Sequence, residues 1–361
     1  MSIFFQTRNK ALQAQLAASG LDGLLVTQLA NWYYLTGFTG ESGALVVGAD
    51  ERPTLVTDGR FTVQARQETS GVRVAAQKGG LLESVGQKLK EQRFRIIGFD
   101  PQHVSVAQMR ALRKAAGPRM RWVPAAGLVE SLRMKKDASE LAQMRRAALL
   151  ASELEAHAAK FLRPGLREFE VAAEIEYKMR KAGASGPAFE TIVASGPRAA
   201  LPHARPTARR LRKNELVVLD LGAILGHYCS DITRTFYLGR APARIRGWYR
   251  AVQEAQAAAV AAVKPGASCG EVDAAARNVL ASQRLDKYFV HSTGHGLGIE
   301  VHEDPRVAKG QTRKLEPGNV VTIEPGVYFE GVGGIRIEDD VVVHAGRTEV
   351  LTRFTRDLIE I

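Results

Sequence analysis

Two segments of the sequence match each other without a gap, and each carries an acidic residue at the same position. They cover residues 211–223 and 315–327, and the equivalent acids are Asp220 and Glu324. Both acids follow short runs of branched apolar residues that are typical of buried strands. The copies lie 104 positions apart (315 − 211), so we interpret them as an internal duplication rather than as a short tandem repeat.

Each half of the duplication supplies a second acid on another β-like run. Asp231 stands directly before one such run, and Glu338 lies within another. Alternate residues of a strand share a face, so Arg336 and Glu338 are expected on the face opposite Ile335 and Ile337. An unpaired carboxylate is costly to bury, and these acids therefore need partners.

The four acids could be solvated strand ends or members of surface ion pairs. However, if the two halves pack about a pseudo-twofold axis, equivalent positions converge on that axis and the carboxylates meet. Only cations could hold them together there. Hard oxygen ligands suit Mg²⁺ or Mn²⁺, and one imidazole shifts the preference toward transition metals.

A glycine-rich stretch, residues 290–303, offers the imidazole. It contains three of the eight histidines of the chain, and His295 lies between two glycines. Because glycine lets backbone and ligands approach closely, His295 is our candidate ligand. The stretch could instead bind phosphate, but it lacks the Gly-x-x-x-x-Gly-Lys-Ser/Thr pattern and the strand-to-helix context of a dinucleotide site.

These residues, in this order, resemble the pita-bread-fold metallopeptidase family that contains methionine aminopeptidase, aminopeptidase P and prolidase. The Xaa-Pro branch is most similar, because Pro202, His203 and Ala204 precede Asp220. Residues 31–40 and 57–65 look like the creatinase-type amino-terminal domain of that branch. The resemblance covers nearly the whole chain.

The resemblance implies a site with two divalent metal ions. In it, Asp231 and Glu338 bridge the ions, Asp220 binds one ion, and His295 and Glu324 bind the other. It favours manganese, while cobalt, zinc and iron are also compatible with these ligands.

The resemblance also implies roles in catalysis and substrate binding. His203 and His302 are expected to contact the substrate and stabilise the tetrahedral intermediate, and His291 to lie near the P1′ side. Glu324 is expected to shuttle a proton, and Arg336 to bind substrate or to support the ligands from behind. The other four histidines, which are expected to be structural or exposed, are His103, His157, His227 and His344.

We therefore expect a metal-dependent Xaa-Pro aminopeptidase of the aminopeptidase P type, acting on peptides with proline at the second position and forming a homodimer. A prolidase restricted to dipeptides is the alternative. Many prolidases carry an arginine fourteen residues before the position of Glu324, where this chain has Gly310, with Arg313 three positions later. A metal-free binding protein and a creatinase are disfavoured, because all five ligand positions carry the expected residue type.

The elements that must position these residues predict two domains. Alternating helix-like and strand-like segments over residues 8–123 indicate an α/β domain, assigned here to residues 1–124. Residues 125–136 are interpreted as a linker, and residues 137–361 as the pita-bread catalytic domain. The capping pattern from Asp137 to Glu140 predicts the start of a long helix.

Further predicted helices of the catalytic domain cover residues 168–182, 245–263 and 271–283. The first and the last of them follow matching Arg/Lys-Pro-Gly sequences and carry matching acids, Glu170 and Glu271. The helices are therefore part of the duplication.

Composition limits the remaining function classes. The net charge is +12, but basic residues are spread along the chain, which is more typical of solvated faces than of a nucleic-acid interface. No leader peptide and no apolar run long enough to cross a membrane are found. The two cysteines, Cys229 and Cys269, fit neither a disulfide framework nor a zinc cluster, and a cytoplasmic protein is expected.

Overall fold

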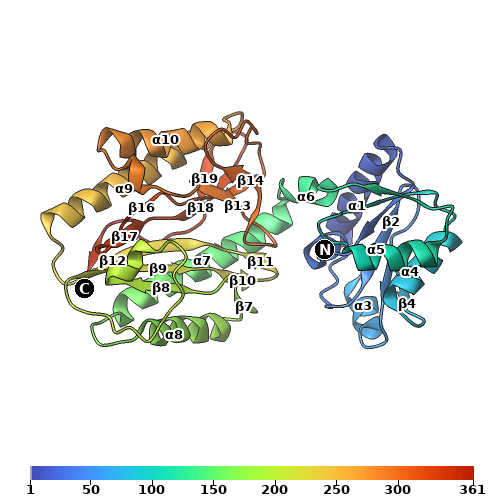
Figure 1. Ribbon diagram of the computed structural model, residues 1–361, viewed down its shortest axis with the longest axis horizontal. Helices are drawn as coiled ribbons and strands as arrows, with labels where there is room; N and C mark the ends of the chain where they lie inside the picture. Colours follow the sequence, from blue (N-terminus) through green and yellow to red (C-terminus); the bar gives the residue numbers. More distant parts are fainter. Residues whose placement is uncertain (1) are drawn as a thin grey trace. The chain divides into compact units, whose positions relative to one another are not determined.

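The computed structural model describes residues 2–361. The chain divides into two compact units, one that ends at Arg133 and one that runs from Met134 to Ile361. Figure 1 labels the helices and strands of both units.

The first unit is an α/β domain built on one six-stranded sheet with the order β4-β3-β2-β1-β5-β6. Strands β1, β5 and β6 run parallel to one another, whereas β2 pairs antiparallel with β1 and β3. Its strands are β1 Gly23–Val26, β2 Ala44–Gly48, β3 Thr54–Thr57, β4 Arg73–Ala76, β5 Ile96–Phe99 and β6 Arg121–Pro124. Its helices are α1 Ser2–Ala18, α2 Leu29–Thr36, α3 Thr62–Glu68, α4 Leu81–Glu91, α5 Val106–Ala116 and α6 Leu128–Arg133.

The segment that we interpreted as a linker, residues 125–136, contains helix α6 and belongs in large part to the first unit. The Arg133 guanidinium, only 2% exposed, donates a hydrogen bond of 2.8 Å to Oδ1 of Asn31. This buried contact holds the end of α6 against α2 of the first unit. The sequence-based domain limits, 1–124 and 137–361, stay a prediction.

The second unit confirms the expected mixed α/β fold, with curved sheets flanked by two pairs of helices (Figure 1). The helices are α7 Ala138–Phe161, α8 Glu168–Lys181, α9 Ala243–Ala262 and α10 Cys269–Ser282. The strands of the first half are β7 Gly186–Pro187, β8 Ile192–Ser195, β9 Glu215–Leu221, β10 Ala223–Leu225, β11 Tyr228–Cys229 and β12 Ile232–Leu238. The remaining strands are β13 Gly294–Gly296, β14 Glu303–Val307, β15 Val320–Ile323, β16 Gly326–Phe329, β17 Gly333–Arg336, β18 Asp339–Val343, β19 Thr348–Val350 and β20 Ile359–Glu360.

The duplication seen in the sequence is also present in the local structure. Glu170 and Glu271 occupy equivalent positions three residues into α8 and α10, where each side chain accepts a hydrogen bond from the backbone N–H of the preceding cap residue. This arrangement satisfies an orphan donor at the start of each helix. The predicted helices of the second unit are confirmed to within a few residues.

Strand β9 is buried on both faces, and its alternate residues belong to different cores. Val217 and Leu219 pack with α7 and α8, whereas Leu216 and Val218 pack with the second half of the duplication. Asp220 lies on the face of Leu216 and Val218, because residues two apart in a strand share a face. Its carboxylate is thus directed toward the second half, as a site between the halves requires.

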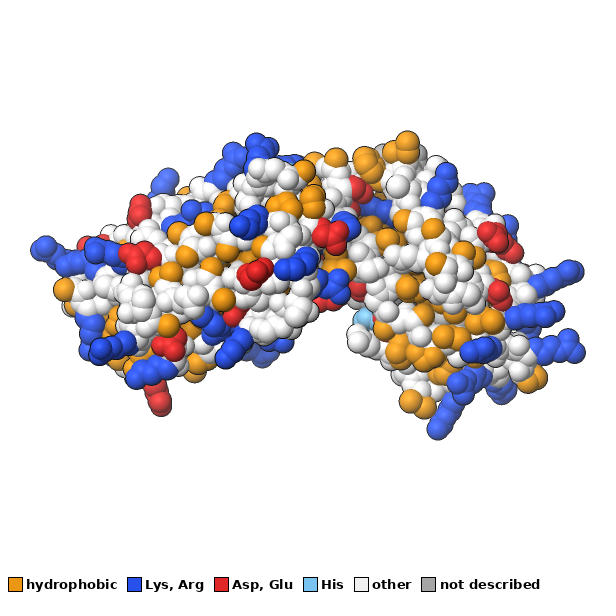
Figure 2. Space-filling model, turned by 90° about the horizontal axis from the view of Figure 1, so that it is seen from above, with side chains coloured by type: hydrophobic (Ala, Val, Ile, Leu, Met, Phe, Trp, Pro, Cys, Tyr) orange, Lys and Arg blue, Asp and Glu red, His pale blue; other side chains and the backbone are white. Residues whose placement is uncertain are grey.

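Basic side chains do not gather at one place on the visible face of either unit. Figure 2 shows Lys and Arg side chains spread among acidic and apolar ones. Among the described residues, no helix combines the length and the apolar character that a membrane span requires.

Candidate functional site

Two neighbouring strands of the first half bring Asp220 and Asp231 together. β9 and β12 pair antiparallel with Asp220 opposite Thr233, and Asp231 directly precedes β12. Both acids are nearly buried, with exposed fractions of 7% and 5%. The pairing of the two strands therefore places two carboxylates at one end of the hairpin.

The second half repeats this arrangement. β15 and β18 pair antiparallel with Ile323 opposite Asp339. Glu324 follows Ile323 and Glu338 precedes Asp339, so the two glutamates lie at the same end of their strand pair. Glu338 lies just beyond β17 rather than inside it.

His295 completes the group from strand β13, which pairs with β15. Its Nε2 lies 3.5 Å from Oε1 of Glu324 and 3.8 Å from Oδ2 of Asp231. Ligand atoms of Asp231, His295 and Glu338 all lie within 4.8 Å of one another. Three of the predicted acids, Asp231, Glu324 and Glu338, thus meet the predicted imidazole in one place.

The glycine next to His295 is required by the close approach of two strands. A Cβ at Gly294 would clash with the backbone carbonyl oxygen of Thr322 on β15. Glycine removes this clash, and β13 can then pack against β15 with His295 directed at Glu324. The expectation that the glycine-rich stretch permits a close backbone approach is confirmed.

Three of the carboxyl groups have raised pKa values. Burial is the largest cause in each case, and neighbouring carboxylates add to it for Asp231 and Glu338. Burial raises the pKa of Glu324 to about 7, with Arg336 opposing and Asp220 reinforcing the shift. A cluster with these pKa values strongly favours either protons or cations between its oxygens.

The donor set fits divalent metal ions. Oδ1 of Asp220 and Oδ1 of Asp231 are buried, and neither has a hydrogen-bond partner among residues 2–361. Burial lowers the pKa of His295 to about 4, so its ring is neutral and able to ligate near neutral pH. Oxygen atoms with one imidazole suit manganese, iron, cobalt or zinc. The division of Asp220, Asp231, His295, Glu324 and Glu338 into bridging and terminal ligands stays a prediction.

A cavity of about 250 Å³ opens onto these groups. His203 and His302 line it together with the four acids, His295 and Arg336. The rings of His302 and His295 meet edge to face, with centroids 4.3 Å apart. Burial lowers the pKa of His302. The cavity therefore has the imidazole groups of His203 and His302 beside its carboxylates.

His291 lies behind the cavity, since it is not among the residues that line it. Its Nε2 is 2.8 Å from the hydroxyl of Tyr328, and its Nδ1 is 3.9 Å from Oε2 of Glu324. Burial, followed by the charge of Arg336, lowers the pKa of His291 to about 4. The structure shows the contact of His291 with Tyr328. The expected contact of His291 with the substrate stays a prediction.

Arg336 forms hydrogen bonds to several groups of the site, and only 3% of its surface is exposed. Its guanidinium donates to Oδ2 of Asp220, to the hydroxyl of Tyr328 and to the hydroxyl oxygen of Thr233. Thr233 in turn donates a hydrogen bond of 2.5 Å to Oε2 of Glu338. Arg336 therefore connects carboxylates from both halves, as expected for a group that supports the ligands from behind.

Sequence reasoning missed Thr233, Tyr328 and Asp340. Asp340 accepts a hydrogen bond of 3.1 Å from the backbone N–H of Asp231, although the two residues are 109 positions apart. A weak signal existed for Thr233, a polar residue on an otherwise apolar strand two positions after Asp231. Tyr328 and Asp340 carry no comparable signal, because their partners are distant in sequence.

Comparison with known proteins gives two family matches. Residues 142–345 match metallopeptidase family M24, and residues 8–135 match the creatinase/prolidase N-terminal domain. A curated relative, the Xaa-Pro dipeptidase of Pyrococcus horikoshii, is 34% identical over 341 residues, which cover 94% of this chain and 95% of that protein.

Solved structures are similar over nearly the full length. The Xaa-Pro dipeptidase from Bacillus anthracis has a TM-score of 0.96 at 36% identity, with 99% of this chain and 100% of that chain covered. The X-Pro aminopeptidase from Thermotoga maritima has a TM-score of 0.89 at 34% identity, with coverages of 95% and 98%.

Proposed function

We propose that this chain, which belongs to metallopeptidase family M24 and is a metallo-exopeptidase, acts as an Xaa-Pro dipeptidase. The convergence of carboxylates from both halves and His295 on one cavity carries this proposal. The named relatives from Pyrococcus horikoshii and Bacillus anthracis support the dipeptidase over the aminopeptidase P that we expected from the sequence.

We infer that Asp220, Asp231, His295, Glu324 and Glu338 hold two divalent ions, with manganese the first choice. When bound, such a pair supplies Lewis-acid chemistry and lowers the pKa of a shared water toward about 7. The raised pKa values of the buried acids support this inference, because cations would replace the protons that the acids otherwise retain.

The protein side chains supply proton transfer and charge stabilisation. Glu324 lines the cavity and is the carboxylate that accepts and returns a proton during the reaction. His203 and His302, on the wall of the cavity, donate hydrogen bonds where negative charge develops on the attacked carbonyl oxygen. Arg336 keeps Asp220 oriented.

A second candidate is an Xaa-Pro aminopeptidase that accepts longer peptides. The likeness to the Thermotoga maritima enzyme supports it, as does Gly310 at the position where many prolidases carry an arginine. The two candidates share their chemistry and differ in how the end of the substrate is recognised.

A peptide assay separates the two candidates. The purified protein, loaded in turn with Mn²⁺, Co²⁺, Zn²⁺ or Fe²⁺, is incubated with Leu-Pro, Leu-Pro-Ala and the control Leu-Ala, and the products are followed by mass spectrometry. We expect cleavage of Leu-Pro and little of the others. Preferential cleavage of Leu-Pro-Ala would favour the aminopeptidase, and failure with both proline peptides would refute the proposed function.

A further inference from the structure

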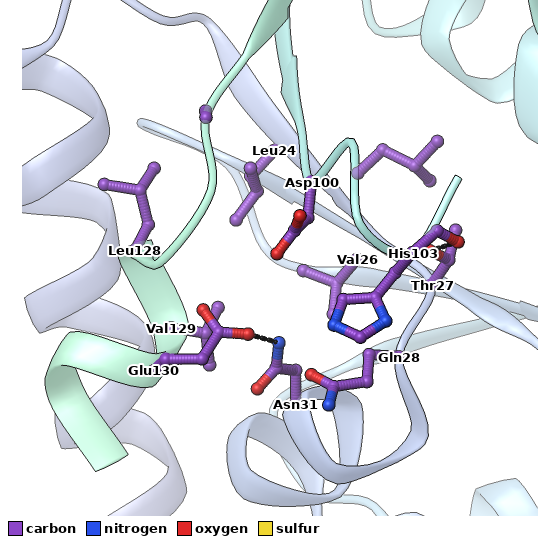
Figure 3. Close-up of a pocket in the computed structure, with 12 residues that line it drawn as sticks. Leu24, Val26, Thr27, Gln28, Asn31, Asp100, His103, Leu128, Val129 and Glu130 are labelled. Carbon is purple, nitrogen blue, oxygen red and sulfur yellow. Dashed lines mark hydrogen bonds between the residues drawn. The ribbon is translucent and has the colours of Figure 1, made fainter. Parts of the chain in front are cut away.

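A second group of potential metal ligands lies in the first unit, away from the site described above. It surrounds a small hollow of about 10 Å³, which is large enough for one ion or water molecule (Figure 3). The hollow lies at the carboxyl ends of the parallel strands β1, β5 and β6. This edge of an open α/β sheet is where ligands commonly bind.

Three side chains from different elements point into the hollow. Asp100 directly follows β5, His103 lies three residues later, and Glu130 is on α6 (Figure 3). One ligand atom from each lies within 4.8 Å of the others. Among the described residues, only one other set meets the same condition, namely Asp231, His295 and Glu338 of the catalytic site.

Buried polar groups orient the carboxylate of Glu130. The amide of Asn31, only 4% exposed, donates a hydrogen bond of 2.5 Å to Oε1 of Glu130. Asn31 is itself held by Arg133, which donates to Oδ1 of Asn31. Hydrogen bonds of this kind fix the direction of metal-binding carboxylates in many proteins.

Asp100 is oriented in a similar way, because its Oδ1 accepts a hydrogen bond of 2.8 Å from the backbone N–H of Gln102. Among residues 2–361, no hydrogen bond is found to Oδ2 of Asp100, to Oε2 of Glu130 or to the ring of His103. One ligand atom of each residue is thus available, and the exposed His103 leaves an entry path from solvent.

We propose that Asp100, His103 and Glu130 form a binding site for one divalent transition-metal ion in the amino-terminal unit. One imidazole and two carboxylates, with water in the fourth position, make up a donor set that suits Zn²⁺. Ligand atoms about 2 Å from zinc lie roughly 3.3 Å from one another. In the structure one ligand atom of each residue lies within 4.8 Å of the others, so binding of one ion would require these atoms to move closer by up to about 1.5 Å.

A bound ion would tie α6 to the end of β5. The alternative use of the same side chains is an ion pair between a protonated His103 and the two carboxylates, which needs no metal. The two arrangements differ in whether the intact protein binds an additional zinc ion through His103.

Metal content of the full-length protein tests the proposal. Wild type and His103→Ala are dialysed to equilibrium against Zn²⁺ buffered in the micromolar range, and zinc is measured by elemental analysis. We expect His103→Ala to hold one zinc ion fewer per chain and to keep its peptidase rate. The matched control is His157→Ala in the second unit, whose partner is Glu174, and it should keep the full zinc content.

Glu130→Gln provides an independent variant, because it keeps the shape of the side chain and removes its charge. It should weaken zinc binding at this site at least about tenfold, the lower range for the loss of a group that supports a metal. Circular dichroism of both variants checks that the first unit remains folded.

Crystals of the wild-type protein grown with zinc show where the additional zinc ion binds. Anomalous scattering at the zinc edge should give a peak between Asp100, His103 and Glu130, absent in His103→Ala. Equal zinc content in wild type and His103→Ala, or a peak that requires millimolar zinc, would overturn the proposal.

Discussion

Arg336 donates a hydrogen bond of 2.5 Å from Nη2 to Oδ2 of Asp220, although the two residues are 116 positions apart in the sequence. Both side chains are nearly buried, with exposed fractions of 3% and 10%. Asp220 belongs to the first half of the duplication and Arg336 to the second. This pair therefore connects the two halves at the centre of the site.

Replacing Arg336 with methionine should destabilise the metal-free protein more than the metal-loaded protein. Without the guanidinium, Asp220 is a buried carboxylate with no positive partner, and breaking such a pair costs about 3–5 kcal/mol. Bound divalent ions would compensate this charge in the loaded protein. Urea unfolding, with chelator and with saturating Mn²⁺, measures both free energies of unfolding.

The control for this prediction is Arg246→Met, which removes a surface ion pair with Glu360. It should change the free energy of unfolding by about 1 kcal/mol or less under both conditions. Equal losses for Arg336→Met with and without metal would contradict the compensation argument.

Asp231→Asn should reduce metal occupancy and nearly abolish turnover. The substitution keeps the size of a buried side chain but removes a negative charge from the cluster. Removal of a group that hydrogen-bonds to a metal ligand costs about 10–100-fold in metal affinity or activity. Removal of the ligand itself should therefore cost at least about 100-fold. Elemental analysis and the Leu-Pro assay provide the two readouts.

Asp286→Asn is the control for Asp231→Asn, because Asp286 is exposed and is not among the residues that line the cavity. It should retain both metal and activity. Full activity of Asp231→Asn with two bound ions would exclude a bridging role for Asp231.

His203→Ala should lower kcat while leaving the metal content unchanged. His203 lines the cavity without belonging to the ligand set, and removal of one donor to a developing oxyanion costs about 10²–10³-fold in kcat. Steady-state kinetics and elemental analysis on the same sample test both parts. If His203→Ala loses metal, the division between ligands and substrate-contacting residues is wrong.

The stability of the metal-free protein should respond to pH through Glu324. Its pKa is about 7 in the folded state and 4.5 as the ordinary value, so the folded state holds this proton more tightly than the unfolded state does. The protonated Glu324 therefore adds to the free energy of unfolding below pH 4.5, and this stabilisation is lost as pH rises to about 7. Metal binding must displace the same proton, so apparent metal affinity should rise over this interval.

Comparison with Glu324→Gln isolates this effect. The neutral histidines of the site make stability depend on pH in the opposite direction, but they do so in both proteins, so their contribution cancels in the difference. Chemical unfolding in chelator at several pH values should show wild type losing stability relative to Glu324→Gln between pH 4.5 and about 7. A constant difference across this range would show that Glu324 does not hold the proton.

Gly294→Ala should destabilise the second unit, because the added Cβ would clash with the backbone of Thr322 next to His295. Overpacking of this kind costs about 1–3 kcal/mol, and it should also weaken metal binding by moving His295. In the control Gly247→Ala, on α9, the Cβ meets no atom within 4 Å, so this variant should be neutral or slightly stabilising. Thermal unfolding compares the two variants.

The sequence by itself determined the duplication, the helix starts and the chemical types of the ligands. These features are local: a capping pair such as Ser268 and Glu271 is three residues apart, and the continuous apolar run of β9 is enough to predict a buried strand that leads into Asp220. The family resemblance and the mixed α/β fold, both inferred from such motifs, are confirmed by the family matches and by the solved structures.

The tertiary structure alone decided which groups contact one another. The hydrogen bonds of Arg336 to Asp220, of Thr233 to Glu338 and of Asn31 to Glu130 join residues separated by 116, 105 and 99 positions. Local patterns cannot specify such pairs, because distant strands and helices must first pack before their side chains meet. For the same reason His103, an isolated histidine in the sequence, is part of a candidate metal site only in the folded chain.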